Sequence, residues 1–277
     1  VSTALGILIF QYSIHELRFD NFIENADQIY RITASTYKDN LKVNESAETP
    51  HFTVSVLSEK LPEVAQAARL MSTRYWFDCT LKYNDLLFNE HNLYYADPSL
   101  LSMFSLKWEK GNNAALKKPF TAVLTSSTAS RYFGTDDPIG KVLHLKGSFE
   151  ENDYTVTGVV SDLPSATHLD FTILLSLSSL ESNQYFQNFT TYTYIEVEPK
   201  TQQASIQEKI NDFVSNHATE LNLDKSKVQI SAQPIKDIHL HSALSEEIKP
   251  GGNAVTIYFL MSIAGLILFI AWINHIN

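Results

Sequence analysis

The stretch FGTDDPIGK at residues 133–141 contains the two glycines and the following lysine of a phosphate-binding loop. That loop, G-x-x-x-x-G-K-[ST], wraps backbone N–H groups around phosphate and places its last hydroxyl on Mg²⁺. Here five residues separate Gly134 from Gly140, and Val142 stands in place of the hydroxyl. Because Gly134 also follows a helical run, we interpret the stretch as a helix stop and a turn into the next strand. It does not predict a nucleotide site.

Two histidines in IHLHS, His239 and His241, could ligate a metal ion. On a β-strand, a spacing of two would place both imidazoles on one face, as metal ligands often are. No cluster of Cys, His or carboxylate side chains nearby in the sequence supplies further ligands, and His168 could approach only through the fold. We therefore predict no metal-binding residues.

Two other groups of polar side chains could serve catalysis. Glu150, Glu151 and Asp153 form an acidic run before a predicted strand, which we interpret as a solvated turn. The hydroxyls of LTSSTAS lack the small-residue elbow of a nucleophilic serine, and we expect Thr125 or Ser126 to cap a helix. The sequence thus predicts no catalytic or cofactor-binding residue, and we expect no enzyme activity in this chain.

Apolar residues at both ends of the chain indicate membrane helices. Residues 253–277 contain no Asp, Glu, Lys or Arg, and twenty helical residues span about 30 Å, the thickness of a bilayer's hydrocarbon core. Tyr258 and Trp272 lie near the ends of this run, where aromatic rings favour the interface. Residues 1–14 are also uncharged. They are too short to span, so we interpret them as the end of a first transmembrane helix and 253–277 as a truncated second one.

The charged residues all lie between these ends, which predicts a polar domain on one side of the membrane. The net charge of −10 makes nucleic acid or an anionic membrane surface a poor partner. The single cysteine, Cys79, excludes an internal disulfide. A domain of this size can bury a sizeable core, and we expect two lobes.

Two β-α-β units are predicted on either side of a long middle segment. The first comprises strand 29–37, helix 49–63 and strand 64–73; the second comprises strand 190–198, helix 203–222 and strand 227–235. We expect Thr49 to be the N-cap of the first helix and Pro50 its first residue. The two units suggest one split α+β lobe formed by residues 29–74 and 187–250.

The middle segment, residues 75–186, is predicted to be an inserted second lobe that is richer in strands. Its candidate strands are 77–85, 92–99, 120–126, 153–162 and 171–176. Between the first membrane segment and the split lobe, residues 15–28 are predicted to form a helical stalk, because apolar residues recur there at helical spacing. These residues are Phe19, Phe22, Ile23, Ala26 and Ile29.

Several segments resemble the extracytoplasmic domain of MacB/FtsX-type ABC transporter permeases. They are HELRFDNFIENADQIYRI after the first apolar run, LYYADPSLLSMFSLKWEKGNNAALKKPFTAVLTSSTASRYFGTDDPIGKVLHL at 93–145, VTGVVSDLPSATHLDF, IKDIHLHS, and AWINHIN at the end. The resemblance covers nearly the whole chain in order.

The resemblance implies a fold and a set of partners. The fold would be α+β, with a porter-like βαβ-βαβ lobe interrupted by an inserted strand-rich α/β lobe and flanked by transmembrane helices. The domain would lie in the periplasm, anchored in the bilayer of the bacterial inner membrane. The implied partners are a cytoplasmic ABC ATPase, a second permease half or a second copy of the chain, and a periplasmic adaptor.

The function implied by the resemblance is that of a permease subunit in an exporter or a mechanotransmission complex. ATP would be hydrolysed by a separate nucleotide-binding domain or subunit, and HELRFDNFIEN would carry the resulting motion outward. The alternative is a ligand-binding sensor ectodomain of a two-span membrane receptor. A membrane-anchored enzyme ranks third, since no catalytic set is present.

Overall fold

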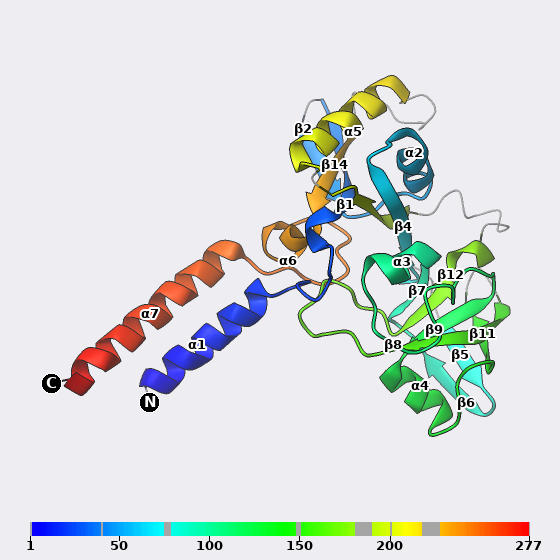
Figure 1. The fold of residues 1–277 in the computed structure, drawn as a ribbon, viewed down its shortest axis with the longest axis horizontal. Helices are drawn as coiled ribbons and strands as arrows, with labels where there is room; N and C mark the ends of the chain where they lie inside the picture. The colour runs from blue at the N-terminus through cyan, green and yellow to red at the C-terminus, as the bar shows by residue number, and fades with distance from the viewer. Residues whose placement is uncertain are drawn as a thin grey trace.

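A pair of helices projects from a larger body of strands and helices (Figure 1). This computed structural model describes residues 2–39, 41–74, 79–147, 151–180, 190–199, 201–217 and 228–276. The pair consists of α1 (Ser2–Leu17) and α7 (Ala254–Ile276). The two run side by side, and both ends of the chain lie at the tip of the pair that is farthest from the body (Figure 1).

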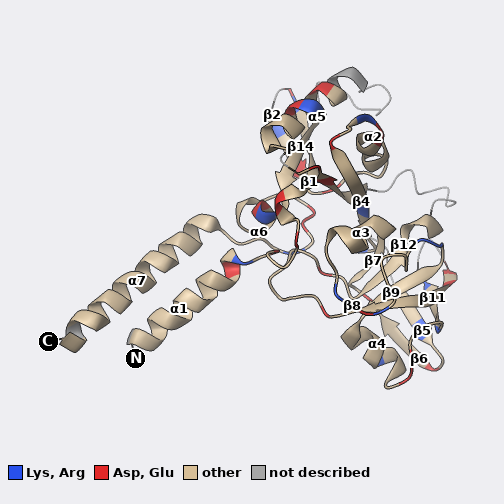
Figure 2. Ribbon diagram, in the orientation of Figure 1, with Lys and Arg blue, Asp and Glu red and all other residues tan. Residues whose placement is uncertain are grey.

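The helix pair is apolar over almost its whole length. Apart from Glu16 at the end of α1, it carries no Lys, Arg, Asp or Glu (Figure 2). Residues Ala254–Ile273 of α7 are long and apolar enough to cross a membrane by length and composition. Gly6 allows the close approach of the two helices, because a Cβ there would lie 3.0 Å from Leu268 Cγ. The predicted second membrane helix is thus a helix in the structure.

The two chain segments that carry the predicted β-α-β units together form a four-stranded antiparallel sheet. Its strands are β1 (Ile29–Lys38), β4 (Val64–Ser72), β13 (Thr190–Val197) and β14 (Val228–Pro234), in the order β14-β1-β13-β4. Helices α2 (Thr53–Lys60) and α5 (Gln203–His217) connect β1 to β4 and β13 to β14. Leu57 of α2 and Ile206, Ile210 and Phe213 of α5 pack with Ile32 on one face of this sheet. The strands and helices of both predicted β-α-β units are confirmed within the described residues; residues 218–222 of the predicted second helix and residue 227 of the predicted strand lie outside them.

The open edge of this sheet is covered by a glutamine from α5. The carboxamide oxygen of Gln207 accepts a hydrogen bond from Ala232 N at 2.8 Å, and its nitrogen donates to Ile230 O at 3.1 Å. Gln207 thus satisfies the backbone of β14 in the place of a neighbouring strand, which protects the edge from pairing with another chain.

The strands between the two units continue the same sheet. They are β5 (Thr80–Tyr83), β6 (Leu86–Asn89), β7 (Leu93–Ala96), β8 (Trp108–Lys110), β9 (Thr121–Thr125), β10 (Val142–Lys146), β11 (Glu151–Val160) and β12 (Ile173–Ser176). From β4 the order is β7-β12-β9-β11-β10-β5-β6, with β8 paired to β11. All five predicted strands of this segment are present, while β6, β8 and β10 are additional. Because β4 and β7 pair directly, one hydrogen-bonded sheet runs through the whole body.

The stretch FGTDDPIGK at residues 133–141 is a helix stop followed by a turn. Helix α4 (Ser126–Phe133) ends at Gly134, whose φ of +61° suits glycine and whose N–H donates to Ser130 O at 2.9 Å. A turn then leads into β10, which confirms the interpretation. Thr125 occupies the N-cap position, but its hydroxyl donates to Thr128. The carboxylate of Asp162 caps the helix instead, since it accepts a hydrogen bond from Ser127 N at 3.0 Å.

Two local predictions are wrong, one of a helix start and one of a solvated turn. Thr49 and Pro50 form a short strand, β3 (Thr49–Pro50), that pairs with β13, and α2 begins only at Thr53. The buried hydroxyl of Thr49 lies 2.8 Å from the hydroxyl of Thr193, so it is not available to cap a helix. The acidic run is not a solvated turn, because Glu151 and Asp153 belong to β11; Glu150 lies outside the described residues.

The two carboxylates of that run flank a histidine on the neighbouring strand. His144 Nδ1 lies 2.8 Å from Asp153 Oδ1, and its Nε2 lies 3.3 Å from Glu151 Oε1. The hydrogen bond to Asp153 is the main cause that raises the pKa of His144, and Glu151 adds to it. The group is an exposed charge ladder across β10 and β11.

The predicted helical stalk over residues 15–28 is wrong beyond Leu17. Helix α1 ends there, and turns lead to a short 3-10 helix, Ala26–Gln28. The apolar residues at helical spacing pack inward instead, since Ile23, Ala26 and Ile29 belong to the core below the sheet. Beyond the helix end, Asp20 adopts a left-handed backbone, with φ of +59°, which does not fit a continuing helix.

Candidate functional site at the base of the helix pair

Polar side chains gather where the two helices join the body. We call this region the junction: the segment 18–25 after α1, the segment 242–253 before α7, and the side chains that hold them. It contains two non-glycine residues with positive φ, Asp20 and Glu246, one on each segment. Such backbone conformations persist only where the surroundings hold them, and they are enriched at functional sites.

The segment after α1 is held by the loop formed by residues 161–172. Asp20 is buried and donates its backbone N–H to Ala166 O at 3.0 Å. Its carboxylate accepts hydrogen bonds from Thr167 Oγ1 at 2.6 Å and from His168 N at 3.2 Å. Asp20 Oδ2 also lies 2.9 Å from His168 Nδ1, an ion pair when the imidazole is protonated. Asp20 is therefore held through both its backbone N–H and its carboxylate.

The charge state of Asp20 follows from these contacts. Burial opposes ionisation of the carboxyl group, but the charge of His168 and the hydrogen bonds from His168 and Thr167 outweigh that effect. The pKa of Asp20 is consequently held below its ordinary value. The carboxylate is a permanent anchor at neutral pH.

His168 carries the connection on to the centre of the sheet. Its Nε2 lies 3.0 Å from the hydroxyl of Tyr194, a fully buried residue of β13. Phe104 packs edge-on against the Tyr194 ring, with 4.9 Å between ring centroids. The end of α1 is thus joined through two side chains to a central strand.

A second contact joins α1 to the short helix α6 (Ile238–His241). Glu16 Oε2 lies 2.8 Å from His239 Nε2, and the ring of Phe19 stacks on the same imidazole with 3.3 Å between centroids. The backbone O of His239 also accepts a hydrogen bond from Gly252 N at 2.7 Å, just before α7. A Cβ at Gly252 would lie 2.9 Å from a side-chain carbon of Leu240, so glycine permits this close contact. His239 therefore touches the chain at both helices.

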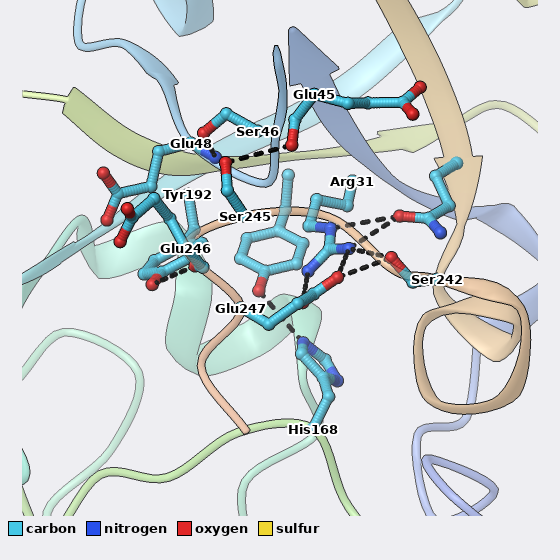
Figure 3. Close-up of polar contacts among 12 residues, drawn as sticks. Arg31, Glu45, Ser46, Glu48, His168, Tyr192, Ser242, Ser245, Glu246 and Glu247 are labelled. Carbon is cyan, nitrogen blue, oxygen red and sulfur yellow. Dashed lines mark hydrogen bonds and ion pairs between the residues drawn. The ribbon is translucent and has the colours of Figure 1, made fainter. Parts of the chain in front are cut away.

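The segment before α7 is held by a buried arginine. Arg31 lies in β1 with its side chain fully buried, and it binds Glu247 through two hydrogen bonds of 2.5 and 2.7 Å (Figure 3). The guanidinium also donates to Gln233 Oε1 at 2.7 Å and to Ser242 Oγ at 3.2 Å. Bidentate pairing to a carboxylate is the strongest arrangement available to arginine. Glu247 is thereby fixed to β1 and β14 together.

Glu246 faces a different set of partners. Its carboxylate pairs with Arg74. Its backbone O accepts a hydrogen bond from Tyr192 Oη at 2.7 Å (Figure 3). Arg74 also lies 3.5 Å from the buried carboxylate of Glu48, which accepts a hydrogen bond from Thr190 at 2.5 Å. Burial, aided by Glu246, raises the pKa of Glu48, and Thr190 and Arg74 only partly offset this.

Backbone pairing completes the attachment of this segment. Ser245 N donates to Glu45 O at 2.8 Å and Ala47 N donates to Ser245 O at 3.0 Å, which adds the segment to the edge of β2 (Leu41–Ser46). Lys249 Nζ then donates to Thr167 O at 3.2 Å. Since Thr167 also holds Asp20, the two halves of the junction are linked.

The histidines considered as metal ligands are dispersed in the structure. IHLHS forms the helix α6 and not a strand, so His239 and His241 do not share a face: His239 meets Glu16, while His241 lies 3.5 Å from Asp237. His168 faces Asp20. Within the described ranges, no group of three or more His, Cys, Asp or Glu side chains could hold a metal ion. The arrangement is suited to holding two chain segments in place.

Sequence reasoning considered His168 and His239 only as metal ligands and missed the charged residues that hold the junction. Arg31 interrupts the apolar strand IYRIT, and a charge at such a position is the signal that could have indicated a buried partner. Asp20 and Glu247 gave no comparable signal, because acidic residues in predicted loops are ordinarily solvated.

Comparison with known proteins places the fold. The sequence model of the family described as "MacB-like periplasmic core domain" matches residues 1–213. The structure is similar to a domain of a protein described as a permease from Porphyromonas gingivalis, with a TM-score of 0.61, 20% identity, and coverage of 76% of this chain and 91% of that one. No curated protein matches the chain significantly.

Two further solved structures are similar at lower identity. The periplasmic region of MacB from Actinobacillus actinomycetemcomitans has a TM-score of 0.51 and 15% identity, with 76% of this chain and 92% of that chain covered. The extracellular domain of the noncanonic ABC-type transporter YknZ from Gram-positive bacteria has a TM-score of 0.52 and 15% identity, with 74% and 99% covered.

Proposed function

Because this chain belongs to the family of MacB-like periplasmic core domains of ABC transporter permeases, we propose that it couples ATP hydrolysis in the cytoplasm to export or mechanotransmission across the cell envelope. ATP would be hydrolysed by a separate ATPase. The chain itself would be the non-catalytic output part of a permease subunit in the bacterial inner membrane, with its body in the periplasm.

The observation that supports this proposal is the junction. Both helices end in one network of buried polar contacts, and the network reaches strands β1, β13 and β14 directly. Removing one partner of a buried ion pair costs about 3–5 kcal/mol. Because such contacts are costly to break, a displacement of the helices would shift the attached sheet. The continuous sheet would then carry the displacement to β6 at its far edge.

We also propose a division of the body into two lobes. Residues 29–74 and 187–250 would form the porter-like lobe, and residues 75–186 the inserted lobe. Two apolar clusters support this division, one around α2 and α5 and another around β5, β9 and β11, while a third, which includes Leu70 and Tyr94, joins the two lobes. The pairing of β4 with β7 would make the lobes move together.

The partners follow from the proposed function. A cytoplasmic ABC ATPase would drive the helices, and a second permease half or a second copy of the chain would complete the pathway. A periplasmic adaptor would receive the output. Nucleic acid has no place in this proposal.

Insertion of two residues after Ile14 tests the coupling. Two residues rotate a helix by about 200°, which would turn the packed face of α1 away from α7 while the junction stays anchored. In the full permease with its ATPase, we expect ATP hydrolysis to continue and export to be lost. The control is the same insertion after Asp85, in the turn between β5 and β6 and far from the junction. Unchanged export in the Ile14 insertion would refute the proposed coupling.

A further inference from the structure

A hollow of about 620 Å³ lies on the surface beside helix α3 (Pro98–Met103). All of its lining residues come from the continuous stretch 98–117. On one side, α3 is tied to β4 by a hydrogen bond from Ser99 Oγ to Ala67 O at 2.6 Å. On the other, the stretch after β8 is tied to β11 by a hydrogen bond from Thr157 Oγ1 to Ala115 O at 2.7 Å. The hollow therefore lies where the four-stranded sheet meets the inserted strands, a position typical of ligand sites.

A fixed indole forms part of the lining. Trp108 is partly buried against the core, and its Nε1 donates to Asn113 Oδ1 at 2.7 Å. The ring rests on Gly158, where a Cβ would come within 2.5 Å of Trp108 Cζ3. Only glycine at this position leaves room for the ring. Trp108 is thus held in place before any ligand arrives, which reduces the entropy lost on binding.

Two carboxamides beside the indole are also oriented. Asn112 Oδ1 accepts a hydrogen bond from Ala114 N at 2.9 Å, and Asn113 Oδ1 accepts the indole N–H. Because both oxygens are engaged within the protein, the NH₂ groups are the parts of these side chains suited to a ligand. They donate hydrogen bonds, which hydroxyl groups accept.

The charge around the hollow is positive, although the chain as a whole is strongly acidic. Residues 107–118 contain four lysines against one glutamate, and the exposed Lys117 lines the hollow. Of these lysines, Lys110 pairs with Asp137. Glu109 accepts hydrogen bonds from Ser126 and Ser161, and the nearby Asp97 pairs with Arg69. An anionic ligand is therefore favoured here.

We propose that this hollow binds an acidic saccharide. The apolar face of a sugar ring would stack on Trp108, its hydroxyls would accept hydrogen bonds from the Asn112 and Asn113 amides, and its acidic group would pair with Lys117. A sugar combines these three features in one ring. The site is distinct from the junction, and the proposal goes beyond the coupling function and does not depend on it.

Binding of oligosaccharides to the full chain in nanodiscs tests the proposal. The probes are tetragalacturonic acid, the neutral tetrasaccharide maltotetraose, and inorganic phosphate, each followed by saturation-transfer NMR and calorimetry. We expect tetragalacturonic acid to bind most tightly, maltotetraose to bind weakly, and phosphate not to compete. Trp108→Phe should weaken the binding of both saccharides at least tenfold. The circular dichroism spectrum and the Tm confirm that the variant is folded.

A pair of neighbouring lysines provides the matched control. Lys117→Gln should weaken tetragalacturonic acid about tenfold, which corresponds to about 1.4 kcal/mol, and leave maltotetraose unaffected. Lys118 is equally exposed but does not line the hollow, so Lys118→Gln should leave both unchanged. If Lys117→Gln and Lys118→Gln weakened the binding of tetragalacturonic acid equally, the attraction would come from diffuse positive charge, and the proposal would be overturned. Competition by phosphate alone, or no binding of tetragalacturonic acid at millimolar concentration, would overturn it too.

Discussion

The two sides of the Arg31–Glu247 pair should respond unequally to mutation. The side chain of Arg31 is fully buried, whereas that of Glu247 keeps 14% of its surface exposed. Glu247→Met leaves a buried guanidinium that cannot lose its proton, with Gln233 and Ser242 as its remaining acceptors. Arg31→Met leaves a carboxylate that water can reach. We therefore expect Glu247→Met to be the more destabilising change.

The magnitude follows from the burial of the pair. Breaking a buried ion pair from one side costs about 3–5 kcal/mol, whereas replacing both partners by apolar side chains is often neutral or stabilising. Glu247→Met should lie at the upper end of that range and Arg31→Met at or below the lower end. The double variant should be less destabilised than either single one, which gives a coupling free energy of several kcal/mol.

Urea unfolding of the full chain in detergent micelles measures these differences. The free energy of unfolding is compared for the wild type, the two single variants and the double variant, with the m-value checked for two-state behaviour. An exposed pair, Lys42 with Glu45, is the control, and its removal should cost less than about 1 kcal/mol. Additive single effects, or a larger loss for Arg31→Met than for Glu247→Met, would refute the argument.

Three further variants have defined outcomes. Gly158→Ala should lower the free energy of unfolding by about 1–3 kcal/mol in urea unfolding, because its Cβ would collide with Trp108, whereas Gly265→Ala, which meets no neighbouring atom, should not. His144→Ala should remove a stabilisation of the folded state. That stabilisation is fully present below the ordinary histidine pKa of about 6.5 and is lost as pH rises through the raised pKa of His144 in the folded state. Comparing the free energies of unfolding of the wild type and the variant at about pH 5.5 and about pH 8.5 tests this. Gln207→Ala should uncover the edge of β14 and promote association, visible by light scattering, while Gln202→Ala should leave the chain unassociated.

The regular elements of the fold were predictable from periodic patterns. Alternation in β13 and the apolar face of α5 each specify an element locally, and both β-α-β units followed from such patterns. The capping of α4 was only half predictable: Thr125 is at the N-cap, but the capping carboxylate comes from Asp162, far along the chain. Thr49 shows the same limit, because tertiary pairing with β13 overrides an otherwise good helix-start signal.

The junction could not be predicted because its contacts join distant segments. Asp20 meets His168, and Arg31 meets Glu247, in each case across most of the chain. Local composition makes Asp20 resemble any acidic loop residue. A left-handed backbone has only a weak sequence signature, an enrichment in glycine, asparagine and aspartate that does not single out this position. The apolar residues that follow Phe19 recur at helical spacing, but they pack inward from an irregular segment and do not form a helix.

The place of β13 in the sheet also determines the order in which the chain can be built. β13 lies between β1 and β4, so these two strands have no direct pairing with each other. During synthesis β1 and β4 emerge long before β13, which begins only at Thr190, and each must wait with an unpaired edge. The strands from β5 to β12 are all complete by Ser176 and can associate during that interval. Until the last third of the chain has been made, β1 and β4 therefore each lack the strand that lies between them in the finished sheet.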